Sequence, residues 1–405
     1  MVEDRHPYSP LTGGSIRLLT LYPGSFHNPI EGRLESAILT AGCAYEALSY
    51  VWEDEGDPSM MNLNEKPFCI TKNLECALRH LRYTERPRDL WVDAICINQQ
   101  NDDEKSKQVA MMGRIYNKAQ KVYAWLGEGN RQSDCVFDVL NEYQVQRART
   151  VISSNLDAAE ELSSHRQMFW DNFTKMVGNA PEEHNMDEFR WLCPLSERRY
   201  WRRVWIIQEL VLAKAVVICC GDRSIDFDDI YGLSLDWGSF EQGFDFGTYH
   251  NEASGELESH LRGWNTIRAI RGHRRRREPS WAFGVEGPHV VSAGLPERGD
   301  VAMLDEVVHL YAQNHECTDF RDKAYGLREL VPQWNDNLVV DYTKSTSEVF
   351  VDVAKLGLFK AKAHGGIHVA LRLCSARGLG DHEDRKGFED FLRQRLPQSF
   401  ITEFD

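Results

Sequence analysis

The stretch that decides the fold is Leu90-Trp-Val-Asp-Ala-Ile-Cys-Ile-Asn98, which is nearly continuous in apolar character. A run of this kind is typical of a central strand that is buried on both faces of a sheet. Asp93 is the one charged residue that interrupts it, and Asn98 follows the last apolar position. We therefore expect a central strand over residues 90–98, with polar side chains at its carboxyl end.

Strand-like and helix-like segments alternate on both sides of this stretch. Strand composition marks residues 15–22, 45–52, 121–126 and 215–220, and a hairpin is expected around Asn64-Glu65, between residues 61–64 and 67–71. Helical spacing marks a helix after Asn73, which would cap it, and helices over residues 104–119 and 201–213. The alternation predicts an α/β fold with a parallel sheet that helices cover on both faces.

The same patterns divide the chain into two parts. Residues 1–228 are expected to form the α/β domain, interrupted by a more polar helical insertion at about residues 134–190. Beyond it the signal weakens: residues 302–313 and 345–360 have helical patterns, and residues 285–299 are rich in Gly and Pro. We therefore expect residues 229–405 to be a mostly helical C-terminal region.

Composition and charge exclude several classes of protein. Hydrophobic residues make up 42% and charged residues 27%, as in ordinary globular domains. The formal net charge of −15 argues against broad binding to nucleic acid or to an anionic membrane. The basic run at residues 273–277 is better explained as a solvated face than as a nuclear signal or a nucleic-acid site. No apolar run approaches the roughly 20 residues of a membrane span.

The 10 cysteines bear on the compartment of the protein. No Cys-x-x-Cys pair and no zinc-finger spacing of His occurs, so no metal site is expected. Unpatterned thiols and a polar N-terminus without a signal peptide are typical of a reduced intracellular protein. We expect the protein to be cytoplasmic.

Candidate ligand-binding residues follow from the sheet, because ligands of such sheets bind outside the carboxyl ends of the strands. The residues at or just after the expected strand ends are Ser49, Tyr50, Trp52, Asn98 and Gln99, together with Asp93 within the central strand. Each has a structural alternative. Trp52 stacks on a ligand ring or belongs to the core, Asp93 binds a ligand or caps a helix, and Asn98 and Gln99 bind a ligand or form a turn.

Glu209 is the candidate catalytic residue. It follows Trp205 by four positions, so the two side chains share one face of the expected helix, and its neighbours are apolar. A carboxylate there is costly unless it has a partner or stays neutral. Its functional role would be that of a catalytic carboxylate, and its structural role would be an ion pair with Arg202, Arg203 or another base. Arg203 itself would bind a phosphate or pair with Glu197.

Three segments together resemble the heterokaryon incompatibility (HET) domain of filamentous fungi. They are Tyr45-Glu-Ala-Leu-Ser-Tyr-Val-Trp52, Leu90-Trp-Val-Asp-Ala-Ile-Cys-Ile-Asn-Gln99, and Tyr200-Trp-Arg-Arg-Val-Trp-Ile-Ile-Gln-Glu209. Arg321-Asp-Lys-Ala-Tyr-Gly-Leu327 also looks like a family feature. One departure is Glu53, where family members usually have Gly, which permits backbone conformations that Glu resists.

The resemblance implies a role in self/non-self recognition that ends in growth arrest or cell death. HET domains are remotely similar to TIR domains, which implies a flavodoxin-like or TIR-like core. Some TIR domains hydrolyse NAD⁺ with a Glu four positions after a Trp, the spacing of Trp205 and Glu209. NAD⁺ is then the substrate, without a metal or other cofactor, and the active form is a homo-oligomer, with a second incompatibility protein as a further partner. The alternatives are a non-enzymatic oligomerising adaptor and a nucleotide-binding sensor without hydrolysis.

Overall fold

The computed structural model describes residues 8–138 with gaps at 41 and 53–57, residues 140–141, 195–230, 263–274 with a gap at 264, residue 311, residues 315–358 with a gap at 336, and residue 394. Glu53, the loop at residues 285–299 and nearly all of the insertion expected at residues 134–190 and of the helix expected at residues 302–313 lie outside this part. In the described part, no helix is both long and apolar enough to cross a membrane.

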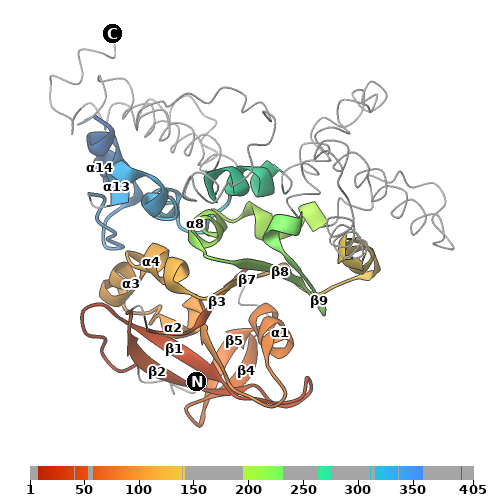
Figure 1. Cartoon of the computed structure of the whole chain (residues 1–405). Coiled ribbons are helices and arrows are strands. Elements are labelled where there is room, and N and C mark those ends of the chain that lie inside the picture. Colours follow the sequence, from red (N-terminus) through yellow and green to blue (C-terminus); the bar gives the residue numbers. More distant parts are fainter. Residues whose placement is uncertain are drawn as a thin grey trace, which may run out of the picture.

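A nine-stranded sheet organises the described residues, in the order β5-β4-β2-β1-β6-β3-β7-β8-β9. Figure 1 shows β3, β7, β8 and β9 following one another across the sheet. The strands are β1 Ser15–Leu21, β2 Glu31–Ile38, β3 Glu46–Tyr50, β4 Pro58–Leu63, β5 Lys66–Thr71, β6 Arg88–Trp91, β7 Val122–Trp125, β8 Val216–Cys220 and β9 Arg223–Asp226. The α/β class is confirmed. The central strands β6, β3, β7 and β8 are parallel, but β1 and β9 pair antiparallel with this group, so the sheet is mixed rather than wholly parallel.

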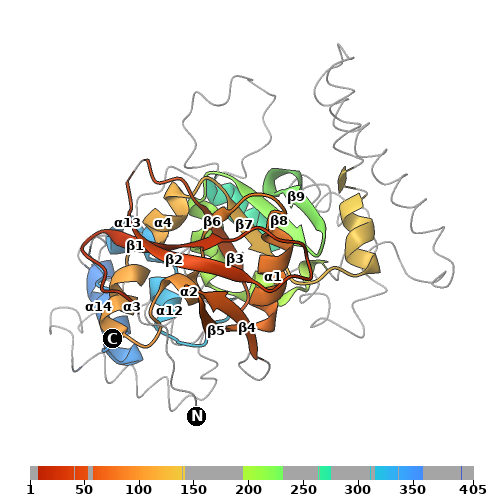
Figure 2. The same ribbon diagram turned by 90° about the horizontal axis from the view of Figure 1, so that it is seen from below.

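The expected hairpin is confirmed in β4 and β5, whose turn holds Asn64 and Glu65 in the left-handed region with φ of 51° and 64°. Both central residues at positive φ are the mark of a tight type I′ turn. The helix beside it, α1 Lys72–Leu81, is capped by Thr71 rather than by Asn73, because the Thr71 hydroxyl accepts from the Leu74 amide. Figure 2 shows α1 lying beside this hairpin.

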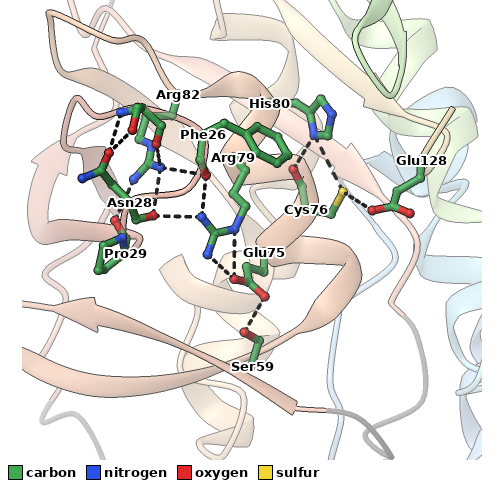
Figure 3. A network of polar contacts seen from close by, with 11 residues as sticks. Phe26, Asn28, Pro29, Ser59, Glu75, Cys76, Arg79, His80, Arg82 and Glu128 are labelled. Carbon is green, nitrogen blue, oxygen red and sulfur yellow. Dashed lines mark hydrogen bonds and ion pairs between the residues drawn. The ribbon is translucent and has the colours of Figure 1, made fainter.

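Arg79 of α1 and Arg82, the residue that follows this helix, fasten it to the connection between β1 and β2 (Figure 3). Arg79 donates to the carbonyls of Phe26 and Asn28 at 2.6 and 2.8 Å, and Arg82 donates to the Pro29 carbonyl at 2.7 Å. Glu75 in turn accepts from Arg79 and from Ser59 on β4. These bonds satisfy carbonyls that no strand pairs, so the connection is held in one conformation.

The remaining helices are shorter than the sequence pattern suggests. They are α2 Asp93–Cys96, α3 Asp102–Val109, α4 Met112–Lys118, the 3₁₀ turn η1 Arg199–Arg202, α8 Trp205–Leu212, α12 Asp322–Tyr325, the 3₁₀ turn η5 Arg328–Leu330, α13 Pro332–Asn335 and α14 Thr346–Leu358. The helix expected at residues 104–119 is broken between α3 and α4, and the one expected at 201–213 divides into η1 and α8. The helix expected at 345–360 is confirmed by α14.

The prediction of a single strand over residues 90–98 is wrong. β6 ends at Trp91, and the chain then makes the one-turn helix α2, in which the Cys96 amide donates to the Val92 carbonyl at 2.7 Å. Asp93 opens this helix, where a carboxylate is favourable, and it also accepts from the Ala94 amide. The turn carries Asp93 out of the apolar strand layer to the carboxyl end of the central strands.

The segment 315–358 packs against the helices that follow β6. The Val204 amide donates to the Glu316 carbonyl at 3.0 Å, and the Tyr342 amide donates to the Ser106 hydroxyl at 3.1 Å. The Arg328 guanidinium donates to the Ala110 carbonyl at 3.2 Å. Residues from this segment and from the sheet therefore share one core.

Arg17 ties β1 to α3 through a buried ion pair. It is 3% exposed and donates to both carboxylate oxygens of Glu104, at 2.6 and 2.9 Å. It also donates to the Cys96 carbonyl at 3.1 Å. Loss of one member of such a pair leaves the other charge without compensation.

We therefore expect Arg17→Met to lower the free energy of unfolding by about 3–5 kcal/mol, because Glu104 loses its partner. The matched control is Arg33→Met on the neighbouring strand β2, whose ion pair with Glu35 is half exposed, and its cost is expected to stay below about 1 kcal/mol. Urea unfolding of the three proteins measures both. Equal effects of the two substitutions would contradict this role of Arg17.

Candidate functional site

A cavity of about 590 Å³ opens at the carboxyl ends of β3 and β6. Its volume is within the range of small-molecule sites. The lining residues are Val51, Trp52, Asp93, Ile97, Gln99, Lys105, Val109, Met112, Arg199, Arg203, Trp205, Glu316, Cys317, Thr318, Asp319, Asp322 and Tyr342. This is the edge of the sheet at which the sequence predicts a ligand.

Two tryptophans of the cavity are each held by an aspartate. The Trp52 indole N–H donates to Asp93 at 3.0 Å, and the Trp205 indole N–H donates to Asp322 at 3.0 Å. Trp52 is 44% exposed, which is unusual for so large an apolar side chain. Both rings are therefore oriented by a hydrogen bond to a carboxylate in the wall of the cavity.

Arg203 interacts electrostatically with two carboxylates, those of Glu209 and Asp93. Burial alone would lower the pKa of its guanidinium, but Glu209 and Asp93 raise it, so this group stays charged. The guanidinium donates to the Tyr50 carbonyl at the end of β3. Burial raises the pKa of Asp93 and Arg203 opposes that rise. Arg203 and Asp93 both line the cavity, so a ligand there meets this charge cluster directly.

Glu209 lies behind the cavity wall and is 1% exposed. Its carboxyl group accepts a hydrogen bond from the Ser49 hydroxyl, which also lies 2.7 Å from the Tyr200 hydroxyl. Burial raises the pKa of Glu209 to about 7, against the lowering effect of Arg203. Glu209 thus belongs to the Arg203 cluster, and near neutral pH its protonated and ionised forms are both populated. Its side chain does not line the cavity.

The other predicted residues are placed as follows. Trp52, Asp93, Gln99, Arg203 and Trp205 line the cavity, whereas Ser49, Tyr50, Asn98 and Glu209 do not. Gln99 donates from its side chain to the Asp93 carbonyl at 3.0 Å. Asn98 forms a turn, since its side chain accepts from the Gln100 amide at 3.2 Å. The sequence therefore identifies one wall of the cavity.

The opposite wall comes from residues that the sequence argument did not select. Cys317, Thr318, Asp319, Asp322 and Tyr342 all follow the α/β domain in sequence. The pKa of Asp322 is raised to about 6 because burial outweighs the hydrogen bonds from Tyr342 and Trp205. The signal in the sequence for this wall is the family-like segment Arg321–Leu327, which contains Asp322.

No group of three or more His, Cys, Asp and Glu side chains in the described residues is arranged to hold a metal ion. The charged and aromatic groups that line the cavity include carboxylates, two guanidinium groups and two indole rings.

The raised pKa of Glu209 predicts a pH-dependent stability. In the unfolded chain this group ionises near its ordinary value of 4.5, but in the folded protein it ionises near 7, so the folded state holds the extra proton between these values. The contribution of this group to the free energy of unfolding is fully present below pH 4.5, and it is lost as the pH rises to about 7.

Glu209→Gln keeps the shape of the neutral acid, so the wild type should lose up to about 3 kcal/mol relative to this variant between pH 5 and 8. Urea unfolding across that range measures the difference. A constant difference at all pH values would show that Glu209 does not hold this proton.

The family match covers one of the two walls of the cavity. The family model described as "Heterokaryon incompatibility protein (HET)" matches residues 45–209. Heterokaryon incompatibility protein 6, OR allele, of Neurospora crassa is 31% identical over 235 residues, which cover 52% of this chain and 34% of that protein. The match thus spans about a third of the relative's length. No solved structure matches the chain, so the likeness to TIR domains stays a prediction. On these matches, residues 45–209 are similar to the HET family, and the chain is similar over part of its length to a fungal heterokaryon incompatibility protein.

Proposed function

We propose that this chain is an effector of fungal self/non-self recognition whose HET domain binds NAD⁺ and cleaves its nicotinamide–ribose bond when the protein self-associates. The recognition role rests on the matched family and on the name of the Neurospora relative, heterokaryon incompatibility protein 6. The observation that supports NAD⁺ as the ligand is the cavity at the strand ends. Its lining combines two indole rings with Arg203 and several carboxylates.

The cavity offers a complementary group for each part of a dinucleotide. Arg199, Arg203 and Lys105 are cationic side chains in its wall, and they suit a pyrophosphate. Trp52 and Trp205 suit planar rings. Asp93 is the carboxylate of the Arg203 cluster that already borders the open volume.

The reaction needs little chemistry from the protein. The bond between the ribose carbon and the nicotinamide nitrogen breaks, and its electron pair leaves with the ring, which becomes neutral. Water then adds to the ribose carbon and loses a proton, giving nicotinamide and ADP-ribose. A carboxylate beside the ribose stabilises the positive charge that develops on the sugar. Glu209 is the proposed carboxylate.

The burial of Glu209 sets a condition on this proposal. Its carboxyl group is bonded to Ser49, is 1% exposed and does not line the cavity, so the ribose reaches it only after neighbouring side chains move. Self-association is the proposed cause of that movement. This condition also fits the need to keep such an activity silent in a growing cell.

The same burial favours a second candidate, a non-enzymatic adaptor in which Glu209 is a structural member of the Arg203 cluster. In that case the cavity binds no nucleotide, and the HET domain acts through oligomerisation alone. A nucleotide sensor that binds NAD⁺ without cleaving it is the third candidate.

NAD⁺ consumption by the purified protein distinguishes these candidates. We expect the wild type to turn over NAD⁺ at high protein concentration and much less on dilution. Glu209→Gln should lower kcat by about 100-fold or more, while the matched control Glu35→Gln, at an exposed ion pair on β2, should leave it unchanged. Turnover should rise as the pH passes about 7, where Glu209 ionises.

A folded Glu209→Gln variant with wild-type turnover would remove Glu209 from the mechanism. Binding of NAD⁺ by calorimetry without turnover at any concentration would establish the sensor. The absence of both binding and turnover would establish the adaptor.

A further inference from the structure

The two tryptophan–aspartate pairs are the least expected feature of the cavity. Trp52 and Asp93 come from the ends of β3 and β6, whereas Trp205 and Asp322 come from the starts of α8 and α12. Each indole N–H donates to its carboxylate at 3.0 Å, and all four side chains line the same open volume. Distant parts of the chain thus build the same arrangement twice.

In each pair the aspartate orients the indole ring and places a carboxylate next to it. The hydrogen bond sets the rotation of the indole, and the ring of Trp205 is also packed on Gly326, at which a Cβ atom would lie 3.5 Å from the six-membered ring. The face of an indole is electron-rich, and among aromatic side chains it binds cations best. A carboxylate that accepts from the N–H adds negative charge to the same site.

Two cationic side chains of the cavity also contact its wall. Arg203 is bonded to the Tyr50 carbonyl within the carboxylate cluster, and the Lys105 ammonium lies 4.3 Å from the centre of the Tyr342 ring. The lining therefore combines indole rings bonded to carboxylates with positive groups that interact with the same carboxylates. A ligand that fits both carries a positive planar ring and a negative group.

We propose that the Trp52–Asp93 and Trp205–Asp322 pairs form a subsite for a planar cationic heterocycle, so that the cavity binds the oxidised pyridine dinucleotide in preference to the reduced one. The identity of the dinucleotide rests on the proposed function. The preference for a cationic ring does not, and it can be measured with small probes.

Two matched ligand pairs test this proposal on the full chain by calorimetry. NAD⁺ and NADH share all phosphates and sugars but differ in the charge of the ring, and 1-methylnicotinamide and nicotinamide differ in the same way without any phosphate. We expect the charged member of each pair to bind at least about tenfold more tightly, the size of a desolvated cation–π contact.

Asp322→Asn is the diagnostic variant, because an amide oxygen still accepts from Trp205 while the charge is lost. It should reduce the preference for the charged ring several-fold and leave ADP-ribose binding unchanged. Asp89→Asn is the control: Asp89 also accepts one side-chain hydrogen bond, from Thr20, but it lies outside the cavity, so the preference should persist. Trp52→Phe, which keeps a ring but loses the N–H, should weaken the preference as well.

The outcomes separate this proposal from the proposed function. Equal binding of NAD⁺ and NADH would overturn the cationic subsite and leave dinucleotide binding intact. Binding of 1-methylnicotinamide but not nicotinamide, without binding of NAD⁺, would support the subsite and overturn the dinucleotide. A preference that survives in Asp322→Asn would overturn the role of the pairs, and the binding of neither charged probe would overturn both proposals.

Discussion

The partly buried charge of Arg203 is the constraint on which the site depends. A guanidinium that is partly withdrawn from water is stabilised by nearby negative charge, and here Asp93 and Glu209 supply it. Asp93 follows β6, Glu209 lies on α8, and the Tyr50 carbonyl that accepts from Arg203 ends β3. These three elements must therefore meet at one point, which is the inner wall of the cavity.

The backbone of Arg203 extends the same constraint to the C-terminal part of the chain. Arg203 forms a β-bridge with Glu316, and the residues after Glu316 make the second wall of the cavity. The family match ends at residue 209, so the matched segment alone holds only one wall. The unit that encloses the cavity is thus larger than the matched segment, and it includes the Asp322 that orients Trp205.

The sequence predicts the parts of this structure that depend on local patterns. The apolar runs of β3, β7 and β8 and the Asn64-Glu65 turn are recognisable because burial and positive φ select their residues. The strand β2 was missed because it alternates buried and exposed residues that include Gly32 and several charges. The end of β6 was misplaced because the one-turn helix α2 is as apolar as the strand before it, and only Asp93 marks the change.

Only part of the cavity lining is predicted from the sequence. Residues next to the central strands were found because ligands bind at strand ends, whereas Asp322 and Tyr342 are brought there by long-range packing that no local pattern records. The burial of Glu209 is also not predicted from the sequence. Helical spacing shows that Glu209 and Trp205 share one face of the helix, but it does not show that only Trp205 lines the cavity. The division at residue 228 stays a prediction.

The most direct test of this account is the pKa of Glu209, measured by ¹³C NMR of its side-chain carboxyl in the free protein and with NAD⁺ bound. The account predicts a value near 7 in the free protein, because the carboxyl group is buried beside Asp93 and Arg203, and a clear change when a ligand contacts Arg203. A value near 4.5 that NAD⁺ leaves unaltered would contradict it.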